Sequence, residues 1–389
     1  MKSRSLHSLL VLSCLVSVAG CSRTDPQYSL EPFKSCDALE RNIKDQAMTQ
    51  IRWQHAWGGG GYGWGGFGYS AEMGMDDGMV AAPEASDVGN SGASSHSTTN
   101  LQESAVDEAD LVKTDGLYMY SIAGDHLLIS QAWPDELDDD TEGWNPDWES
   151  VGEVSRMALE GSADGMYLLE DKTLIVISQL GGEDGEPEAG GSIENSTYQY
   201  SSRGLVKVTI VDASDAAAPV VLRETYTPGM LFTSRMVSGR LYTVTYTPLG
   251  LESVGQSQDK SESINLVKDS ELSDWLPSRF DHSRASIDAD WTVEQEPVCD
   301  CENVYGSERE SGDWLVSVQA LDTADLTSEF HGTSVLTSVD TVYASADSLY
   351  VVSSESRDEG SPWQSYDSSI DTFVHQFDIT DGPLNPSYS

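Results

Sequence analysis

The stretch STTNLQESAVDEADLVKTDGLYMYS, residues 97–121, decides the fold of this chain. Four acidic residues lie within nine positions and run straight into an apolar segment: Asp107, Glu108, Asp110 and Asp115. Such a cluster can serve catalysis, bind a metal ion or lead the chain into a strand. We predict the third role, because short acidic side chains bond nearby backbone N–H groups or pair with Lys113, and Asp115-Gly116 suits a turn. A catalytic pair would need a base and a group that orients it, and neither can be identified here.

Short strands dominate the chain from residue 110 onwards. Apolar runs bounded by turn residues predict strands at 117–130, 166–178, 205–212, 220–226, 231–246, 314–322, 338–354 and 373–379. The first of these runs is a predicted hairpin with Gly124-Asp125 at its turn.

Two sequence features recur within these strands. Strand ends read VDASD at 211–215, LDTAD at 321–325 and FDITD at 377–381, while LYxV recurs at 241–244 and 349–352, with a looser copy at 117–118. Asp212 lies 110 residues before Asp322, and Leu241 lies 108 residues before Leu349. One repeat therefore holds about four strands, the content of a propeller blade. We expect the recurring aspartates to bond N–H groups of the turns.

The opening stretch closely resembles the motif at the start of the propeller in a family of secreted bacterial and archaeal proteins with a C-terminal β-propeller domain. The family pattern, T-N-x-Q-x-x-x-V-D-E-x-D-x-V-K-T-D-G, matches residues 99–116. Looser matches are Ser234-Arg235-Met236, Cys301 followed by Val304-Tyr305, and the hairpin from Tyr343 to Tyr350. The resemblance spans roughly residues 30–380 and implies an all-β propeller with four-stranded blades, a short N-terminal helix and long acidic loops. It implies no established activity.

Members of that family continue well beyond the strand that matches FVHQFDI at 373–379. A propeller closes by placing its last blade beside its first, and an unclosed one exposes sheet edges. We therefore expect a truncated propeller; closure with fewer blades and completion by a partner are the alternatives.

The charge of the chain restricts its partners. The 389 residues include 65 Asp and Glu but only 21 Lys and Arg, for a net charge of −44, and 38% are hydrophobic. Such a chain repels phosphate backbones, which argues against binding nucleic acid. It is compatible with divalent cations, with cationic partners or simply with high solubility.

The first residues resemble the export signal of a bacterial lipoprotein. Two basic residues precede a short apolar segment that ends in Val18-Ala19-Gly20-Cys21. The resemblance implies cleavage after residue 20 and lipidation of Cys21, which would tether the chain to a lipid bilayer. We expect a location at the cell envelope, at the outer membrane or cell surface. An ordinary secretory signal is the alternative.

An amphipathic helix is predicted after Ser35, because Cys36, Leu39, Ile43, Ala47 and Ile51 recur every three or four residues. We assign residues 1–20 to the signal, 21–57 to a spacer and this helix, 58–97 to a flexible glycine- and serine-rich linker, and 98–389 to the propeller. Acidic insertions with few strands are expected near 134–150, 180–202 and 250–312.

If Cys21 is lipidated, Cys36, Cys299 and Cys301 remain in an oxidising compartment, enough for one disulfide and one free thiol. Cys36 pairs with either Cys301 or Cys299. A zinc site is disfavoured, because no second pair of Cys or His ligands follows at suitable spacing.

The insertion at 134–150 contains a candidate calcium loop. Carboxylates occupy positions one, three, five and twelve of an EF-hand-like spacing: Asp138, Asp140, Glu142 and Glu149. Hard oxygen ligands in this pattern suit Ca²⁺, which is the one cofactor that the sequence predicts. Pro146 at the ninth position argues against it, and a solvated acidic loop is the alternative.

We interpret the chain as a membrane-anchored propeller of the cell envelope that binds or scaffolds another envelope protein or a polysaccharide, since loops on a rigid frame commonly carry recognition. No catalytic residues are assigned, and the question of enzymatic activity stays open. A hydrolase or lyase acting on an extracellular polymer is one alternative, although 65 acidic residues do not reveal a catalytic carboxylate pair. A non-functional truncated fragment is the other.

Overall fold

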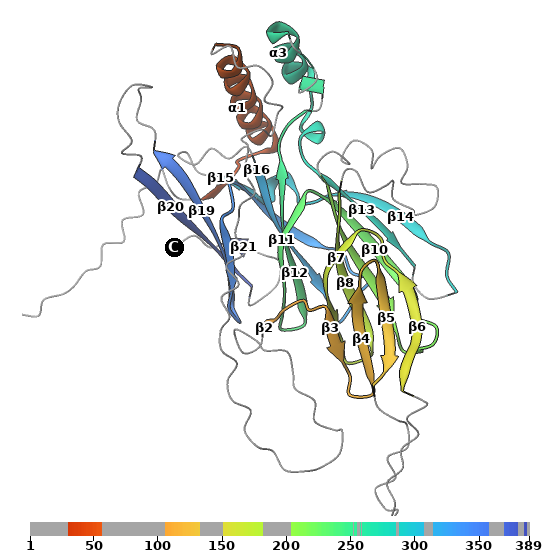
Figure 1. The fold of residues 1–389 in the computed structure, drawn as a ribbon. Helices are drawn as coiled ribbons and strands as arrows, with labels where there is room; N and C mark the ends of the chain where they lie inside the picture. The colour runs from red at the N-terminus through yellow and green to blue at the C-terminus, as the bar shows by residue number, and fades with distance from the viewer. Residues whose placement is uncertain are drawn as a thin grey trace, which may run out of the picture.

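The computed structural model describes residues 30–56, 106–132, 151–181, 204–251, 253–254, 257, 259–284, 288–306, 314–357, 369–379 and 385–386. Four β-sheets form the body of the molecule, and helices α1 (Cys36–Ala56) and α3 (Lys260–Asp269) stand together at one end (Figure 1). The prediction of an all-β fold with an N-terminal helix is confirmed. Within the described residues, no helix combines the length and apolarity needed to cross a membrane.

Sheets 1 and 2 come first along the chain. The strands of sheet 1, in spatial order, are β3 (Val112–Thr114), β4 (Tyr118–Ala123), β5 (His126–Gln131) and β6 (Gly152–Ala158). The strands of sheet 2, in spatial order, are β7 (Ser162–Leu168), β8 (Thr173–Leu180), β9 (Leu205–Asp212), β10 (Val220–Pro228), β13 (Ser278–Ser283) and β14 (Thr292–Pro297).

Sheets 3 and 4 follow. The strands of sheet 3, in spatial order, are β2 (Val106–Asp107), β11 (Met230–Val237), β12 (Arg240–Pro248), β16 (Trp314–Asp322), β17 (His331–Leu336), β15 (Val304–Gly306) and β1 (Glu31–Pro32). The strands of sheet 4 are β18 (Thr341–Ala344), β19 (Ser348–Arg357), β20 (Ser369–Asp378) and β21 (Asn385–Pro386). Each sheet thus contains four antiparallel strands that follow one another in the sheet order, and the extra strands of sheets 2 and 3 lie at their edges.

The predicted repeat corresponds to these four-stranded units. The LYxV copies at 241–244 and 349–352 lie on β12 and β19, the second strands of the four-stranded units in sheets 3 and 4. VDASD and LDTAD begin at the ends of β9 and β16, the third strands of the units in sheets 2 and 3. Asp212 Oδ1 accepts the N–H of Ser214 at 2.9 Å, and Asp322 Oδ1 accepts the N–H of Ala324 at 3.0 Å. The expected turn-bonding role of these aspartates is confirmed.

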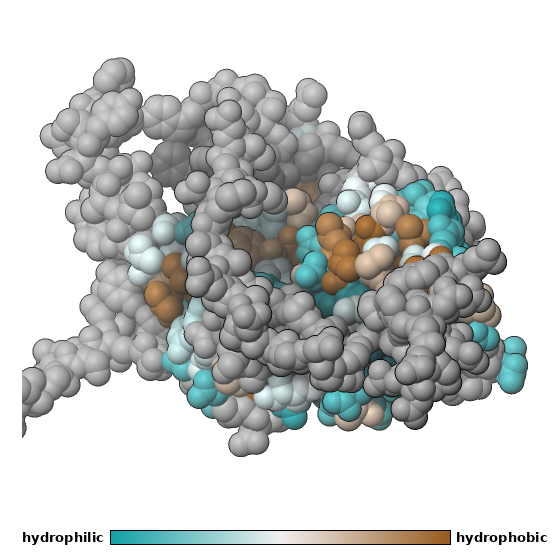
Figure 2. All heavy atoms as spheres, turned by 60° about the horizontal axis from the view of Figure 1, so that its bottom comes forward, coloured by the Kyte–Doolittle hydropathy of each residue, from teal (hydrophilic) through white to brown (hydrophobic). Residues whose placement is uncertain are grey.

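Hydrophobic cores lie between successive sheets. Tyr120 and Ile129 of sheet 1 pack with Val176 of sheet 2, and Ile177 and Val208 on the other face of sheet 2 pack with sheet 3. A third core joins sheet 3 to sheet 4. The sheets therefore stack in chain order, and Figure 1 shows sheets 1 and 4 on opposite sides of the molecule. On the face seen in Figure 2, exposed hydrophobic residues gather to the right of centre, on the side of sheets 1 and 2.

The acidic opening motif joins three of the four sheets. Asp107 on β2 pairs with Met236 on β11 of sheet 3. Asp110 exchanges backbone hydrogen bonds with Met166 on β7 of sheet 2, at 2.9 and 3.2 Å. Val112 then begins sheet 1. The motif therefore sets where the chain enters the first sheet.

The acidic side chains of this motif have structural partners. Lys113 Nζ lies 2.9 Å from Asp107 Oδ1, and Asp110 accepts the N–H of Val112 at 3.4 Å. Asp115 Oδ1 accepts the N–H groups of Leu117 and Tyr118 at 3.0 and 2.7 Å. These bonds confirm the interpretation of the motif as the lead-in to a strand.

Replacing Asp115 with asparagine is expected to destabilise the chain at neutral pH and to matter less in acid. Burial alone would raise the pKa of Asp115, but the N–H groups of Tyr118 and Leu117, the Tyr120 hydroxyl and Lys172 together lower it. Because the folded-state pKa is depressed, its stabilisation is present above about pH 4 and is lost as pH falls through the folded-state pKa.

Urea unfolding of wild type and Asp115→Asn at pH 7 and pH 3 measures this effect. We expect a difference of about 1–3 kcal/mol at pH 7 that shrinks at pH 3. Asp171→Asn is the control, since Asp171 accepts a single backbone N–H, from Thr173. A pH-independent difference would contradict the ionised role of Asp115.

The insertion predicted at 250–312 is not poor in regular structure, and that part of the prediction was wrong. It contains α3 and the hairpin of β13 and β14. The strands SRFDHS and TVEQEP are polar and lack alternation, because they extend the edge of sheet 2 beyond β10 and are held mainly by backbone pairing. Residues 134–150, most of 180–202 and the linker 58–97 lie outside the described residues.

The predicted amphipathic helix is confirmed as α1, and it covers one end of sheet 3. Leu39, Ile43, Ala47 and Ile51 are buried together with Val267 of α3 in a separate core. The Lys44 ammonium also donates to the Ser270 carbonyl just beyond α3. The two helices therefore form one unit attached to the sheet.

Candidate functional site

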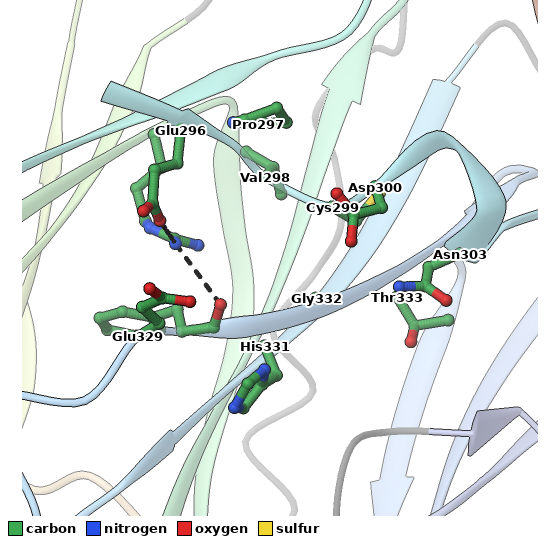
Figure 3. Close-up of a pocket in the computed structure, with 12 residues that line it drawn as sticks. Glu296, Pro297, Val298, Cys299, Asp300, Asn303, Glu329, His331, Gly332 and Thr333 are labelled. Carbon is green, nitrogen blue, oxygen red and sulfur yellow. Dashed lines mark hydrogen bonds and ion pairs between the residues drawn. The ribbon is translucent and has the colours of Figure 1, made fainter. Parts of the chain in front are cut away.

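A pocket with a volume of about 400 Å³ lies where the β13–β14 hairpin of sheet 2 faces β17 of sheet 3 (Figure 3). One wall is the end of β14 with the segment to Asp300, and the other is the segment 329–333. Its polar lining consists of Arg279, Glu296, Asp300, Asn303, Glu329, His331 and Thr333. The pocket thus lies between two rigid sheets and combines one cation with several carboxylates.

Gly332 allows the two walls to approach. A Cβ atom at this position would lie 2.1 Å from the Val298 carbonyl oxygen, far inside van der Waals contact. Any other residue at position 332 would therefore push β17 away from the segment that follows β14. The glycine sets the width of the pocket.

Arg279 on β13 provides the cation of the pocket, and its side chain is 3% exposed. It donates to Glu296 Oε2 at 2.9 Å, to Gln319 Oε1 at 3.3 Å and to the Phe330 carbonyl at 3.4 Å. Burial lowers the pKa of Arg279, and the Glu296 carboxylate opposes that shift. Arginine stays charged in proteins, so this buried cation fixes the position of the Glu296 carboxylate.

A second buried arginine supports the same wall from sheet 2. Arg223 on β10 donates to Asp281 Oδ1 at 2.8 Å and to the carbonyls of Leu326 and Ser328 at 2.7 and 2.8 Å. Both guanidinium groups lie 5.1 Å from the centre of the Phe330 ring. The loop before β17 is thereby held against sheet 2 by hydrogen bonds and cation–π contacts.

The rim of the pocket is negatively charged. In Figure 3, Glu296 and Glu329 reach into the cavity from opposite walls, and the Asp300 carboxylate is directed toward it. Three carboxylates and one arginine thus line the pocket, in a chain whose net charge is −44. Both the local and the overall field favour a cationic ligand.

The thiol of Cys299 also lines the pocket but is poorly suited to nucleophilic attack. It is buried and lies 3.0 Å from the Ser334 hydroxyl. Burial raises the pKa of Cys299 to about 11, so the thiolate is scarce at neutral pH. Cys299 is therefore poorly placed to act as the nucleophile of this pocket.

Comparison with known proteins identifies the fold. A family model described as a Beta propeller domain matches residues 96–389. This chain belongs to the β-propeller domain family. The match begins just before the opening motif and includes sheets 1 to 4, which are therefore blades of the propeller. A search of curated proteins found no match.

Among the described residues, one disulfide joins Cys36, at the start of α1, to Cys301 in the propeller. This is the first of the two pairings that the sequence left open, and Cys299 is the free thiol. The bond connects α1 to the segment that forms one wall of the pocket. Helix and pocket are thus covalently linked.

The remaining sequence-predicted sites lie outside the described residues. They are Cys21, for lipidation, and the calcium-loop carboxylates Asp138, Asp140, Glu142 and Glu149. Among the described side chains of the propeller, no group of three or more His, Cys, Asp and Glu residues is placed to hold a metal ion. The calcium loop stays a prediction.

Sequence reasoning missed Arg279, Glu296 and Glu329. They lie in or beside segments without apolar periodicity, and only the packing of blade 2 against blade 3 brings them together. The available signal was indirect: Arg223 and Arg279 are scarce cations in a very acidic chain, and both lie within strands. Such buried cations commonly have paired carboxylates.

Proposed function

We propose that this propeller is a binding module of the cell envelope, anchored to a membrane through a lipidated Cys21, and that its pocket receives a cationic side chain of another envelope protein. The observation that carries the binding role is the pocket lined by Glu296, Asp300 and Glu329, in which Glu296 pairs with the buried Arg279. The ion pair with Arg279 keeps the Glu296 carboxylate in place before a ligand arrives, which reduces the entropic cost of binding.

The proposed ligand follows from charge and from size. A cavity of about 400 Å³ accommodates the end of a lysine or arginine side chain with its neighbouring backbone. Arginine matches the planar carboxylates best, because its guanidinium can donate two parallel hydrogen bonds. The acidic chain would also attract a cationic partner over distance, most strongly at low salt.

Titration with a short arginine-containing peptide, capped at both ends, tests the binding role. We expect Glu329→Gln to weaken binding by about two- to fivefold, since it removes one accessible ion pair. Glu170→Gln, on the exposed β7–β8 turn, removes the same charge elsewhere and is the matched control. A citrulline peptide that binds equally well, or equal effects of the two variants, would argue against the pocket.

Membrane anchoring is tested separately in cells. The lipoprotein-like pattern at residues 18–21 supports it. We expect Cys21→Ser to move the protein from the membrane fraction to the soluble fraction, whereas Cys14→Ser, within the apolar segment before the cleavage site, leaves it in the membrane fraction. Membrane association that survives Cys21→Ser would exclude anchoring through this residue.

A further inference from the structure

The four described sheets differ in how their faces are covered. Sheets 2 and 3 pack against a neighbour on each face, whereas the described contacts of sheets 1 and 4 cover one face each. The outer face of sheet 4 and the outer face of sheet 1 lie at opposite ends of the stack (Figure 1). These two surfaces occupy the positions where a further blade would pack.

The outer face of sheet 4 is uncharged over its middle rows. Leu349 and Val351 point into the core with sheet 3, so the alternate residues of β19 and their cross-strand partners point outward. The two middle rows of the outer face are Thr341–Val352–Val374 and Tyr343–Tyr350–Gln376. Val374 is 48% exposed and Tyr343 is 45% exposed. The nearest charge on this face is Asp378, at its end.

The outer face of sheet 1 follows the same pattern. Tyr120 and Ile129 point into the core with sheet 2, so the outward rows on β3, β4 and β5 are Val112–Ser121–Leu128 and Thr114–Met119–Ser130. Val112 is 48% exposed. Charges enter these rows only on β6, where Arg156 and Glu153 pair with each other at 2.9 Å.

The absence of charge from the middle rows of both surfaces is unusual for this chain. Charged residues make up 22% of the sequence, yet these twelve outward positions contain none. By contrast, the solvent-exposed edge strand β14 carries Glu294 and Glu296 among its six residues. A strand face that contacts water normally carries charged side chains, whereas a face that packs on another sheet does not.

We propose that the outer face of sheet 4 packs against the outer face of sheet 1 of a second copy of this chain. The contact continues the order in which sheets 1, 2, 3 and 4 already pack within one copy. A twofold axis then buries the outer faces of sheets 1 and 4 of both copies in two equivalent contacts. Two strongly acidic chains can associate only where the contact itself carries little net charge. Here the Arg156–Glu153 ion pair at the β6 edge and Asp378 at the end of sheet 4 flank the uncharged middle rows.

Salt dependence follows from the charge of the chain. Two copies with a net charge of −44 each repel one another, although the middle rows of the contacting faces carry no charge. Salt screens this repulsion without weakening the apolar contact. Association should therefore become tighter as the salt concentration rises, which is the opposite of an interface held by ion pairs.

Light scattering after size exclusion tests the proposal by measuring the mass of the full-length chain in detergent-free buffer. The chain carries Cys21→Ser to remove any lipid. At about 1 M NaCl, near which the screening length falls to a few ångströms, we expect twice the 42.2 kDa of one chain, and more monomer at low salt. A monomer at every salt concentration would overturn the proposal. That result includes the case in which other residues of the same chain cover these faces.

Three valine variants locate the contact. Val374→Glu and Val112→Glu place a charge on the outer face of sheet 4 and of sheet 1, and each should shift the dimer to monomer with an unchanged circular dichroism spectrum. Val293→Glu, at a 43% exposed valine on β14, is the matched control and should leave the dimer intact. A mixture of the first two variants retains one unaltered contact and should partly recover the dimer. A dimer that survives Val374→Glu, or that Val293→Glu dissociates, would refute this interface.

Discussion

Methionine in place of Arg223 is expected to lower the free energy of unfolding by about 3–5 kcal/mol, because removing one partner of a buried ion pair leaves the other without compensation. Arg223 connects Asp281 of blade 2 to the Leu326 and Ser328 carbonyls of the loop before β17. Methionine keeps most of the apolar stem, so the loss reports the charge and its hydrogen bonds. Blades 2 and 3 should separate more easily as a result.

Urea unfolding of the full chain measures the effect of Arg223→Met. Arg41→Met is the matched control: Arg41 is exposed on α1, and its loss should change stability by no more than about 0.5 kcal/mol. Arg223→Lys should recover only part of the stability, since an ammonium group cannot reproduce the fork of a guanidinium. Equal unfolding midpoints for the two methionine variants would show that this network does not hold the blades together.

Loss of the Cys36–Cys301 disulfide is the second large effect that we expect. The bond closes a loop with a sequence separation of 265 residues. Removing a native disulfide typically costs about 2–5 kcal/mol, although the balance of entropy and strain differs between proteins. This bond and one hydrophobic core join α1 to sheet 3. Loss of the bond should therefore destabilise the helix before it destabilises the blades.

Hydrogen exchange of the double variant Cys36→Ser/Cys301→Ser resolves where that loss occurs. We expect faster exchange in α1 and α3, with blades 1 and 2 unchanged. Cys299→Ser, two positions away, leaves the disulfide in place and serves as the control. Uniformly faster exchange in all four blades would mean that the disulfide stabilises the propeller as a whole rather than its attached helices.

Much of the fold was predictable because its information is local. The hairpin at Gly124-Asp125, the stripe along α1 and the aspartates at strand ends all depend on residues within a few positions of one another. The acidic motif was assigned correctly for the same reason, since Asp115 bonds the N–H groups of the next residues. The β13–β14 hairpin was missed because its polar strands have no periodic pattern of their own.

The sequence by itself determined most of the strand positions along the chain, the blade repeat and the two possible partners of Cys36. Only the tertiary structure decided that Cys301 is the partner, that β2 pairs with β11, and that Arg279 and Glu329 share a pocket. Backbone periodicity and turn chemistry act between neighbours along the chain, so a single sequence displays them. The partner of a sheet edge or a buried charge depends on which distant segments pack together, and local patterns do not encode that choice.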